Sequence, residues 1–503
     1  MSIGWIIFIV ATIGWHVGLY GMFKKAGIEG WKAFIPFYNT WCMVEKMELK
    51  KVWFFLQFIP IAGQFITIWI TIKFVEYFGR FSFLHHAATV LVPFIYFPYM
   101  GFSPNERYAG KKVVDNYKKS GAREWIDAAA FAVVAASIIR TFVFEAYTIP
   151  TPSMEKTLLV NDFLFVSKFS YGPRLPNTPL AVPFVHHTLP IINTKSYTEI
   201  ISLPYKRWFA SDVKRNDVVV FNFPVNDTLI NDPEQKFGSQ VTYYQAVRQL
   251  GRDAVLQSYR SMIITRPVDK RENFIKRCVA IGGDSLQVIN GRVHVNGQPQ
   301  QLFPQMERMY ILRNKSAADK PLYVDKDILQ SWGIDPHNDE DFMARNDGTY
   351  IVNVSNEEIS NAKLPATVEL VEYISEPESS LFPYYNANSK WSADNYGPLW
   401  IPQKGGTIQL TPDNVIRYRR CIEVYEGNKF EENNGKYKIN DADATSYTFK
   451  MNYYWMMGDN RHNSLDSRYW GFVPEDHVVG KASLIWFSWE HGPRWKRFFR
   501  SIK

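Results

Sequence analysis

The residues best suited to nucleophilic chemistry lie in the stretch TIPTPSMEKTL, residues 148–158, where Ser153 follows two prolines. Pro150 and Pro152 restrict the backbone and remove two backbone donors, so the loop that carries Ser153 is stiff. An activated serine also needs hydrogen-bond donors for the oxyanion, and the Thr151 hydroxyl with a nearby backbone amide can supply them. A plain turn after the apolar run that precedes it is the alternative that this stretch alone leaves open.

A base for this serine can be a histidine or a neutral lysine. The candidate histidines are His294, His462 and His477. In FIKRCVAIGGD, residues 274–284, strand alternation places Lys276 on one face with the small residues Cys278 and Ala280. Burial there would lower the lysine pKa from about 10.4 to near 8, which requires roughly 3 kcal/mol of desolvation. A solvated lysine at a strand edge is the alternative.

A third stretch, residues 455–482, gathers small polar groups beside large aromatic side chains. Four charged residues lie around Ser464, namely Asp459, Arg461, Asp466 and Arg468. This density favours a functional site, and a structural corner of salt bridges is the alternative.

A different nucleophile is Ser285 in GGDSL, residues 282–286, with His462 as its base, as in a class of α/β esterases. Those enzymes present the serine between a strand and a helix in a doubly wound sheet. Here the motif precedes two alternating runs joined by Asn290-Gly291, which predicts a β-hairpin and argues against the esterase.

Four apolar segments precede these stretches, and each has about the 20 residues that a membrane-spanning helix needs. They cover roughly residues 3–20, 52–72, 83–102 and 126–147. The first lacks a basic start and a small-residue cleavage site, so we interpret it as a retained anchor. Lysine and arginine are concentrated after the first and third segments, and basic loops stay in the cytoplasm. The pattern predicts a multi-pass anchor region over 1–147, with the N-terminus and the rest of the chain outside.

Beyond residue 147 the sequence changes to short alternating runs with turn signals and no βαβ rhythm. We therefore predict a mainly β fold, with an antiparallel β catalytic domain in two parts, 148–298 and 401–485. Residues 299–400, rich in Asn, Asp, Glu and Ser, predict an inserted second β-rich domain, and 486–503 form a basic C-terminal tail. The apolar, proline-rich stretch 172–209 fits either contact with lipid headgroups or a covering loop.

Composition limits the classes of function. The chain of 503 residues is 46% hydrophobic and 16% aromatic, which suits a protein that is partly membrane and partly globular. Its net charge is +8, and the basic residues are concentrated between the apolar segments. This distribution favours a role in membrane topology over binding to nucleic acid. The three cysteines, Cys42, Cys278 and Cys421, have neither a disulfide framework nor metal-ligand spacing, and whether the last two pair is open. We expect no metal and no cofactor.

The three polar stretches, in this order, resemble bacterial type I signal peptidase, the membrane-anchored Ser-Lys leader peptidase. The resemblance covers about residues 141–224, 273–297 and 400–485, and its motifs are Ile149–Leu158, Lys214–Phe221, Ile275–Asp284 and Gly458–Arg468. The chain departs from the family pattern at four positions: Thr151 for serine, Pro152 and Asn216 for glycine, and Lys156 for proline. Four spans instead of one or two is the largest departure.

This resemblance implies that Ser153 is the nucleophile and Lys276 the general base, with the Ser153 amide and the Thr151 hydroxyl as the oxyanion hole. Ser464 would orient the lysine, and Asp466 and Arg468 would form a supporting ion pair. Shallow pockets for small residues would be lined by Tyr147, Ile149, Leu158 and Ile275.

The implied substrates are preproteins with N-terminal signal peptides, cut after small residues by acyl transfer at the outer side of the bacterial cytoplasmic membrane. Preproteins and the lipid bilayer are thus the expected partners, and nucleic acid is not. Two other classes are a non-catalytic β module tethered to a membrane and a self-cleaving, repressor-like Ser-Lys protease.

Overall fold

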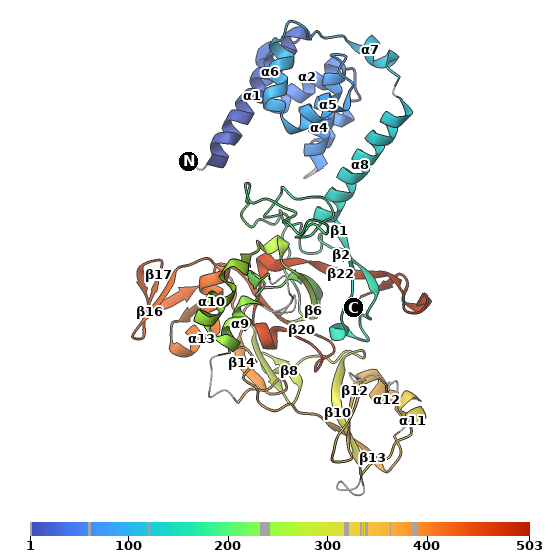
Figure 1. The fold of residues 1–503 in the computed structure, drawn as a ribbon, viewed down its shortest axis with the longest axis vertical. Coiled ribbons are helices and arrows are strands. Elements are labelled where there is room, and N and C mark those ends of the chain that lie inside the picture. The colour runs from blue at the N-terminus through green and yellow to red at the C-terminus, as the bar shows by residue number, and fades with distance from the viewer. Residues whose placement is uncertain are drawn as a thin grey trace. The chain divides into compact units, whose positions relative to one another are not determined.

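The computed structural model describes residues 3–58, 62–118, 120–231, 242–315, 321–331, 334, 336–337, 341–362, 364–384 and 390–502. The chain divides into two compact units, Met1–Ile138 and Ile139–Lys503. The first is helical and the second consists mainly of antiparallel β-sheet, as Figure 1 shows for each unit by itself. The predicted mainly β class of the region after residue 147 is confirmed.

Helices form the first unit. They are α1 (Ile3–Lys25), η1 (Gly30–Phe34), α2 (Tyr38–Lys46), α3 (Val52–Leu56), α4 (Ala62–Glu76), α5 (Phe83–Leu91), α6 (Pro93–Phe102), α7 (Lys111–Asn116) and most of α8 (Gly121–Phe142). Helices α1 and α6 approach each other closely at Gly18. A Cβ added at this glycine would lie 2.2 Å from the carbonyl carbon of Phe97. A glycine at such a contact lets two helix backbones approach closely, and apolar side chains of both helices belong to the buried core of this unit.

Among the described residues, one helix is long and apolar enough to cross a membrane by length and composition, and it is α8. The predicted span 52–72 is divided between α3 and α4, with residues 59–61 outside the described residues. The predicted span 83–102 is interrupted at Val92, because Pro93 disfavours helical geometry in the residue before it. A count of four spans therefore stays a prediction.

The fourth predicted span, 126–147, ends earlier than its hydrophobicity indicated. Helix α8 stops at Phe142, and Phe144–Thr148 form strand β1, which pairs antiparallel with β2. Tertiary pairing of an alternating run thus overrides the apolar continuity of the sequence. Arg140, in the last turn of α8, pairs with Glu145 of β1 at 2.7 Å.

An eight-stranded antiparallel sheet forms the centre of the second unit, in the order β1-β2-β22-β3-β6-β20-β21, with β23 paired to β22. Its strands are β1 (Phe144–Thr148), β2 (Asp162–Ser167), β3 (Val218–Asn222), β6 (Asn273–Ala280), β20 (Tyr453–Met457), β21 (Val473–Pro474), β22 (Val478–Ser488) and β23 (Arg500–Ser501). Register shifts interrupt the pairing of β22 with β2 and with β3, and such irregularities bend a sheet. The order places β6 beside β20, which brings two of the polar stretches together.

Smaller sheets surround this one. One contains β14 (Tyr396–Trp400), β7 (Ser285–Ile289), β8 (Arg292–Val295) and β9 (Gln298–Pro299); others are β4 (Thr228–Ile230) with β5 (Ile263–Thr265), β15 (Thr407–Gln409) with β19 (Ser446–Thr448), and β16 (Phe430–Asn433) with β17 (Lys436–Ile439) and β18 (Ala442–Ala444). The predicted hairpin at Asn290-Gly291 is confirmed, since Ile289 pairs with Arg292 and both turn residues have positive φ. Helices α9 (Tyr243–Leu250), α10 (Arg252–Tyr259), α13 (Pro412–Arg420) and α14 (Ser467–Trp470) were not predicted.

A four-stranded antiparallel sheet occupies part of the stretch 299–400, and we call it the insertion sheet (Figure 1, yellow). Its order is β11 (Phe342–Ala344), β12 (Tyr350–Ser355), β10 (Glu307–Asn314) and β13 (Val368–Glu372), with helices α11 (Lys326–Ser331) and α12 (Asn356–Asn361). Leu312, Leu329 and Val352 belong to a hydrophobic core of its own. The boundaries of the predicted inserted domain remain a prediction.

Candidate active site

The loop that carries Ser153 follows the end of β1 and includes a short 3₁₀ turn, Pro152–Met154. Ser153 is 8% exposed. Asn460, just after β20, fixes this loop: its backbone amide donates to the Ser153 carbonyl at 3.2 Å, and its Nδ2 donates to the Pro152 carbonyl at 3.3 Å. The position of Ser153 therefore depends on a segment about 300 residues later in the sequence.

Lys276 reaches this serine from β6. Its Nζ donates to Ser153 Oγ at 2.6 Å and to the Ile275 carbonyl at 3.0 Å, and the residue is 3% exposed. Burial lowers the pKa of Lys276 to about 8, against the opposing charges of Asp466 and Asp459. A substantial fraction of Lys276 is therefore neutral near pH 8, and a neutral amine at this distance can accept the hydroxyl proton.

Thr151 lies beside the same hydroxyl, with 3.5 Å between Thr151 Oγ1 and Ser153 Oγ. The threonine is exposed, whereas Ser153 is buried. A hydroxyl next to the nucleophile is in reach of the charge that develops when a carbonyl is attacked.

The stretch after β20 packs behind the lysine. Asp466 accepts from the Gly458 amide at 3.1 Å and pairs with Arg468 at 2.8 Å, and both charged residues are buried. A Cβ at Gly458 would lie 2.2 Å from Ser464 Oγ and 2.4 Å from the Ser153 carbonyl oxygen. Only glycine allows this close approach of the two segments.

Ser464 lies beside the Ser153 loop, where an added Cβ at Gly458 would meet its Oγ. It is buried, but its Oγ has no hydrogen-bond partner among the described residues, and the Lys276 bonds go to Ser153 and to Ile275. An orienting contact from Ser464 to the lysine stays a prediction.

One buried ion pair was not assigned a role from the sequence. Arg277 donates from Nη2 and Nε to the two oxygens of Asp459, at 2.6 and 2.8 Å, and Thr157 Oγ1 donates to the same carboxylate at 2.7 Å. The Arg277 guanidinium also lies 4.1 Å from the Phe303 ring centroid. The sequence did contain a sign of this ion pair. Arg277 directly follows Lys276, and Asp459 begins the charged residues around Ser464.

The four residues expected to line substrate pockets are close to one another. Ile149 and Leu158 lie in a buried cluster against which Ile275 packs, and Tyr147 packs in a neighbouring cluster that also contacts Ile275. The Tyr147 hydroxyl donates to Glu145 at 2.8 Å. Ile149 and Leu158 are almost fully buried, and their role as pocket-lining residues stays a prediction.

The three histidines considered as bases are bonded to other residues, and the alternative nucleophile Ser285 lies in a different setting from the one an esterase requires. His462 lies 3.0 Å from Asp394, His477 is bonded to Asp476, and His294 is bonded to the Arg292 carbonyl. Ser285 begins β7 in an antiparallel sheet, which excludes the doubly wound setting of the esterase alternative.

The three cysteines, Cys42, Cys278 and Cys421, are buried free thiols, so the last two do not pair. Within the described ranges, no three His, Cys, Asp or Glu residues form a group that could hold a metal ion.

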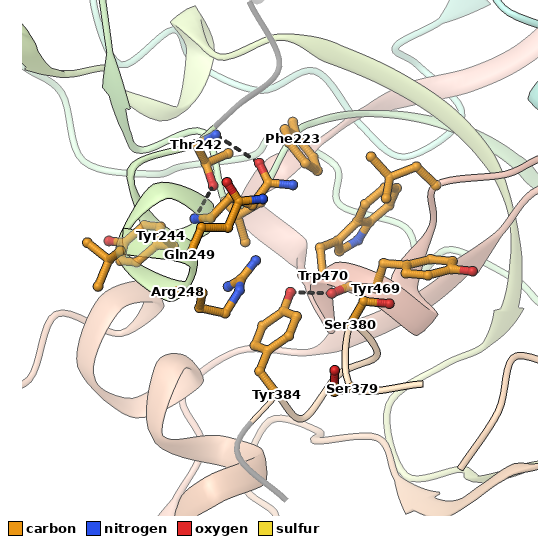
Figure 2. A pocket seen from close by; sticks show the side chains of 14 residues that line it. Phe223, Thr242, Tyr244, Arg248, Gln249, Ser379, Ser380, Tyr384, Tyr469 and Trp470 are labelled. Carbon is orange, nitrogen blue, oxygen red and sulfur yellow. Dashed lines mark hydrogen bonds between the residues drawn. The ribbon is translucent and has the colours of Figure 1, made fainter. Parts of the chain in front are cut away.

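A pocket of about 590 Å³ lies next to the polar stretch on the side of Leu465 and Tyr469 (Figure 2). Helix α9 supplies Arg248, whose guanidinium stacks 3.8 Å from the ring centroid of Tyr384. Trp470, also in the lining, packs on Phe274, whose ring lies 5.7 Å from Lys276 Nζ. Aromatic side chains thus separate this pocket from the lysine.

Comparison with known proteins gives two family matches. A model described as signal peptidase, peptidase S26, matches residues 122–347 and 404–489, and a family of unknown function matches residues 31–111. Signal peptidase I of Haemophilus influenzae is 24% identical over 417 residues, which cover 79% of this chain and 82% of the relative. Signal peptidase I of Buchnera aphidicola from Schizaphis graminum is 25% identical over 70% of this chain and 71% of its own length. Signal peptidase I of Aquifex aeolicus is 22% identical over 71% of this chain and 80% of its own length.

The peptidase model covers more than half of the chain, including the three polar stretches. The family also decides against the non-catalytic module and the repressor-like protease. The chain therefore belongs to the signal peptidase family, peptidase S26, and is a serine endopeptidase of the signal peptidase I type.

Proposed function

We propose that the chain removes signal peptides from exported preproteins through a dyad of Ser153 and Lys276, cutting after small residues. The observation that carries the proposal is the 2.6 Å separation of Lys276 Nζ from Ser153 Oγ, in a site where burial lowers the lysine pKa to about 8. A buried lysine with a lowered pKa and a serine within hydrogen-bond reach are the two parts that a Ser-Lys protease requires.

In the acylation step, neutral Lys276 takes the proton of Ser153 while Oγ attacks the carbonyl carbon before the scissile bond. The oxygen of the tetrahedral intermediate accepts from the Ser153 amide and the Thr151 hydroxyl. The Lys276 ammonium then gives its proton to the leaving amine, and the signal peptide stays on Ser153 as an ester. In the second half, Lys276 takes a proton from water while the water oxygen attacks the ester carbon. The bond from that carbon to Ser153 Oγ then breaks, Lys276 returns the proton to Oγ, and the signal peptide leaves with a free carboxyl group.

The substrate would bind as an extended strand. Strand β1 is at the end of the sheet and pairs only with β2 among the described strands, so its other edge can accept a peptide backbone. The tight clusters around Ile149, Leu158 and Ile275 support small side chains before the scissile bond, with Tyr147 at the side.

The bilayer would hold the enzyme at the site where signal peptides emerge. Helix α8 is the candidate span, and Trp208 stacks 6.1 Å from Phe142 at its end. Several apolar side chains of the 172–209 stretch are largely exposed, among them Ile191, Ile200 and Phe209. This exposure supports lipid contact over a covering loop. In the proposed orientation, the second unit lies on the outer side of the bacterial cytoplasmic membrane.

The test is cleavage of a preprotein by the purified full chain in detergent, with product masses measured for the parent, Ser153→Ala and Lys276→Ala. We expect the parent to cut after a small residue and both folded variants to be inactive. Cleavage by Lys276→Ala at the parent rate would return the role of base to a histidine. Cleavage of the chain itself in place of the preprotein would favour a self-cleaving protease.

A further inference from the structure

Lys156, which stands where the family has proline, is joined to the insertion sheet. It lies three residues after the nucleophile and has a positive φ of 61°. Its Nζ is 3.0 Å from Glu358 Oε1, in α12, and 3.8 Å from Glu307 Oε1, at the start of β10. Both carboxylates come from the stretch 299–400, whereas the lysine belongs to the loop of Ser153.

The environment of Lys156 is acidic and largely dry. Glu307 is 0% exposed, and its Oε1 has no hydrogen-bond partner among the described residues. Burial, with further charge from Asp341, Glu155 and Glu358, raises the pKa of Glu307 to about 8. Burial opposes the charge on Lys156, but Glu358 and Glu307 outweigh it and raise the lysine pKa. Lys156 is therefore charged at neutral pH and pairs chiefly with Glu358, because Glu307, with its raised pKa, is largely protonated there.

A second connection joins the same two parts. Asn353 of β12 donates to Asn460 Oδ1 at 3.1 Å, and Asn460 is the residue whose amides hold the carbonyls of Pro152 and Ser153. The Glu307 amide also donates to the Asp459 carbonyl at 2.9 Å, and its carbonyl accepts from Arg461 at 3.0 Å. The start of β10 thus pairs with the segment that follows β20.

We propose that the insertion sheet positions the nucleophile, with Lys156 as the positioning residue that ties the Ser153 loop to Glu358 and Glu307. This inference rests on the proposed function of Ser153. Asn460 holds the loop before and at the serine, and Lys156 holds it on the far side, so the two contacts restrain it at both ends. A nucleophile displaced by 1 Å loses rate more than affinity, because the reacting atoms no longer meet in line.

The test compares the full-length variants Lys156→Met and Lys156→Arg with the parent in a steady-state preprotein assay. We expect Lys156→Met to lower kcat by about 10-fold or more with little change in KM. Lys156→Arg keeps the charge and should recover most of the rate. The matched control is Lys326→Met, an exposed lysine of α11 without an ion pair among the described residues, which should behave as the parent.

The results for these variants decide whether Lys156 positions the nucleophile. An unchanged kcat in Lys156→Met overturns the inference, as does an equal loss in Lys326→Met. If Lys156→Met does not fold, Glu358→Gln decides, because it weakens the same contact with less charge imbalance; we expect a lower kcat there, and parent kinetics would overturn the inference. A parent whose cleavage does not depend on Ser153 instead overturns the proposed function, which the Ser153→Ala control reveals separately.

Discussion

Lys276 is buried without an ion pair among the described residues, although two aspartates lie near it. Asp466 is neutralised by Arg468, and Asp459 by Arg277, at 2.8 and 2.6 Å. These arginines weaken the pull of the carboxylates on the lysine, so desolvation prevails and its pKa stays low. The two buried ion pairs thus help to hold the pKa of the proposed base at about 8, below the ordinary value of a lysine.

The Asp466→Asn variant tests this arrangement. Asp466 is the largest influence that raises the Lys276 pKa, so its removal should lower that pKa further. The neutral lysine would persist to lower pH, and the rising limb of kcat/KM against pH should shift to lower pH. Because Arg468 loses its partner, stability should fall by about 3–5 kcal/mol, measurable by urea unfolding. A limb that moves to higher pH would contradict this account of the charges.

Thr151 gives a second prediction at the residue scale. Thr151→Val keeps the shape but removes the hydroxyl that lies 3.5 Å from Ser153 Oγ. Loss of one oxyanion donor should lower kcat by about 100-fold, and Thr151→Ser should retain most of the parent rate. Single-turnover rates of preprotein cleavage measure both. Equal rates in the valine variant and the parent would leave the oxyanion hole without this hydroxyl.

At the scale of elements, the site depends on the close approach of the Ser153 loop to the end of β20. Gly458→Ala would place a Cβ 2.4 Å from the Ser153 carbonyl oxygen and 2.2 Å from Ser464 Oγ. The resulting shift should lower kcat by about 100-fold. The control is Gly121→Ala, where an added Cβ meets nothing within 4 Å. The same assay checks both, and parent kinetics in Gly458→Ala would show that the two segments can separate without loss.

The sequence indicated these elements unevenly. The antiparallel character and the Asn290-Gly291 hairpin were predictable, because alternation and turn residues are local signals. The end of α8 was not, because Phe144–Thr148 directly follows a long apolar run, and only its pairing with β2 makes these residues a strand. Helices α9 and α10 interrupt a stretch expected to be β, and each has only eight residues, although the capping box of Thr242 and Gln245 at the start of α9 could have indicated the first.

The residues of the candidate site were likewise predictable where a local motif contains them, and not where a contact depends on the fold. Ser153 and Lys276 were identified from their motifs, and the structure brings their side chains within 2.6 Å. The Arg277–Asp459 pair was missed, because the pairing of residues 182 apart depends on β6 and β20 being neighbours. Lys156 stood out only as a departure from the family pattern, and its partners lie in the insertion sheet, whose contacts no local pattern predicts.

At the scale of the whole molecule, the proposed topology places the second unit outside the membrane and the basic loop before α8 inside. The native cysteines are buried, so introduced cysteines can report topology. With a membrane-impermeant maleimide on intact spheroplasts, we expect Lys436→Cys to be labelled. Lys112→Cys should be labelled only after permeabilisation. Both positions are exposed, and labelling of Lys112→Cys in intact spheroplasts would contradict the proposed orientation.

The measurement that tests the dyad most directly is the pH dependence of kcat/KM for preprotein cleavage by the full chain. A protonated Lys276 cannot take the Ser153 proton, so the rate should fall about tenfold for each pH unit below the lysine pKa. With that pKa at about 8, kcat/KM should rise through pH 8 and level above it. A rising limb near pH 6.5, the ordinary value of histidine, or a rate independent of pH would contradict the assignment of Lys276 as the base.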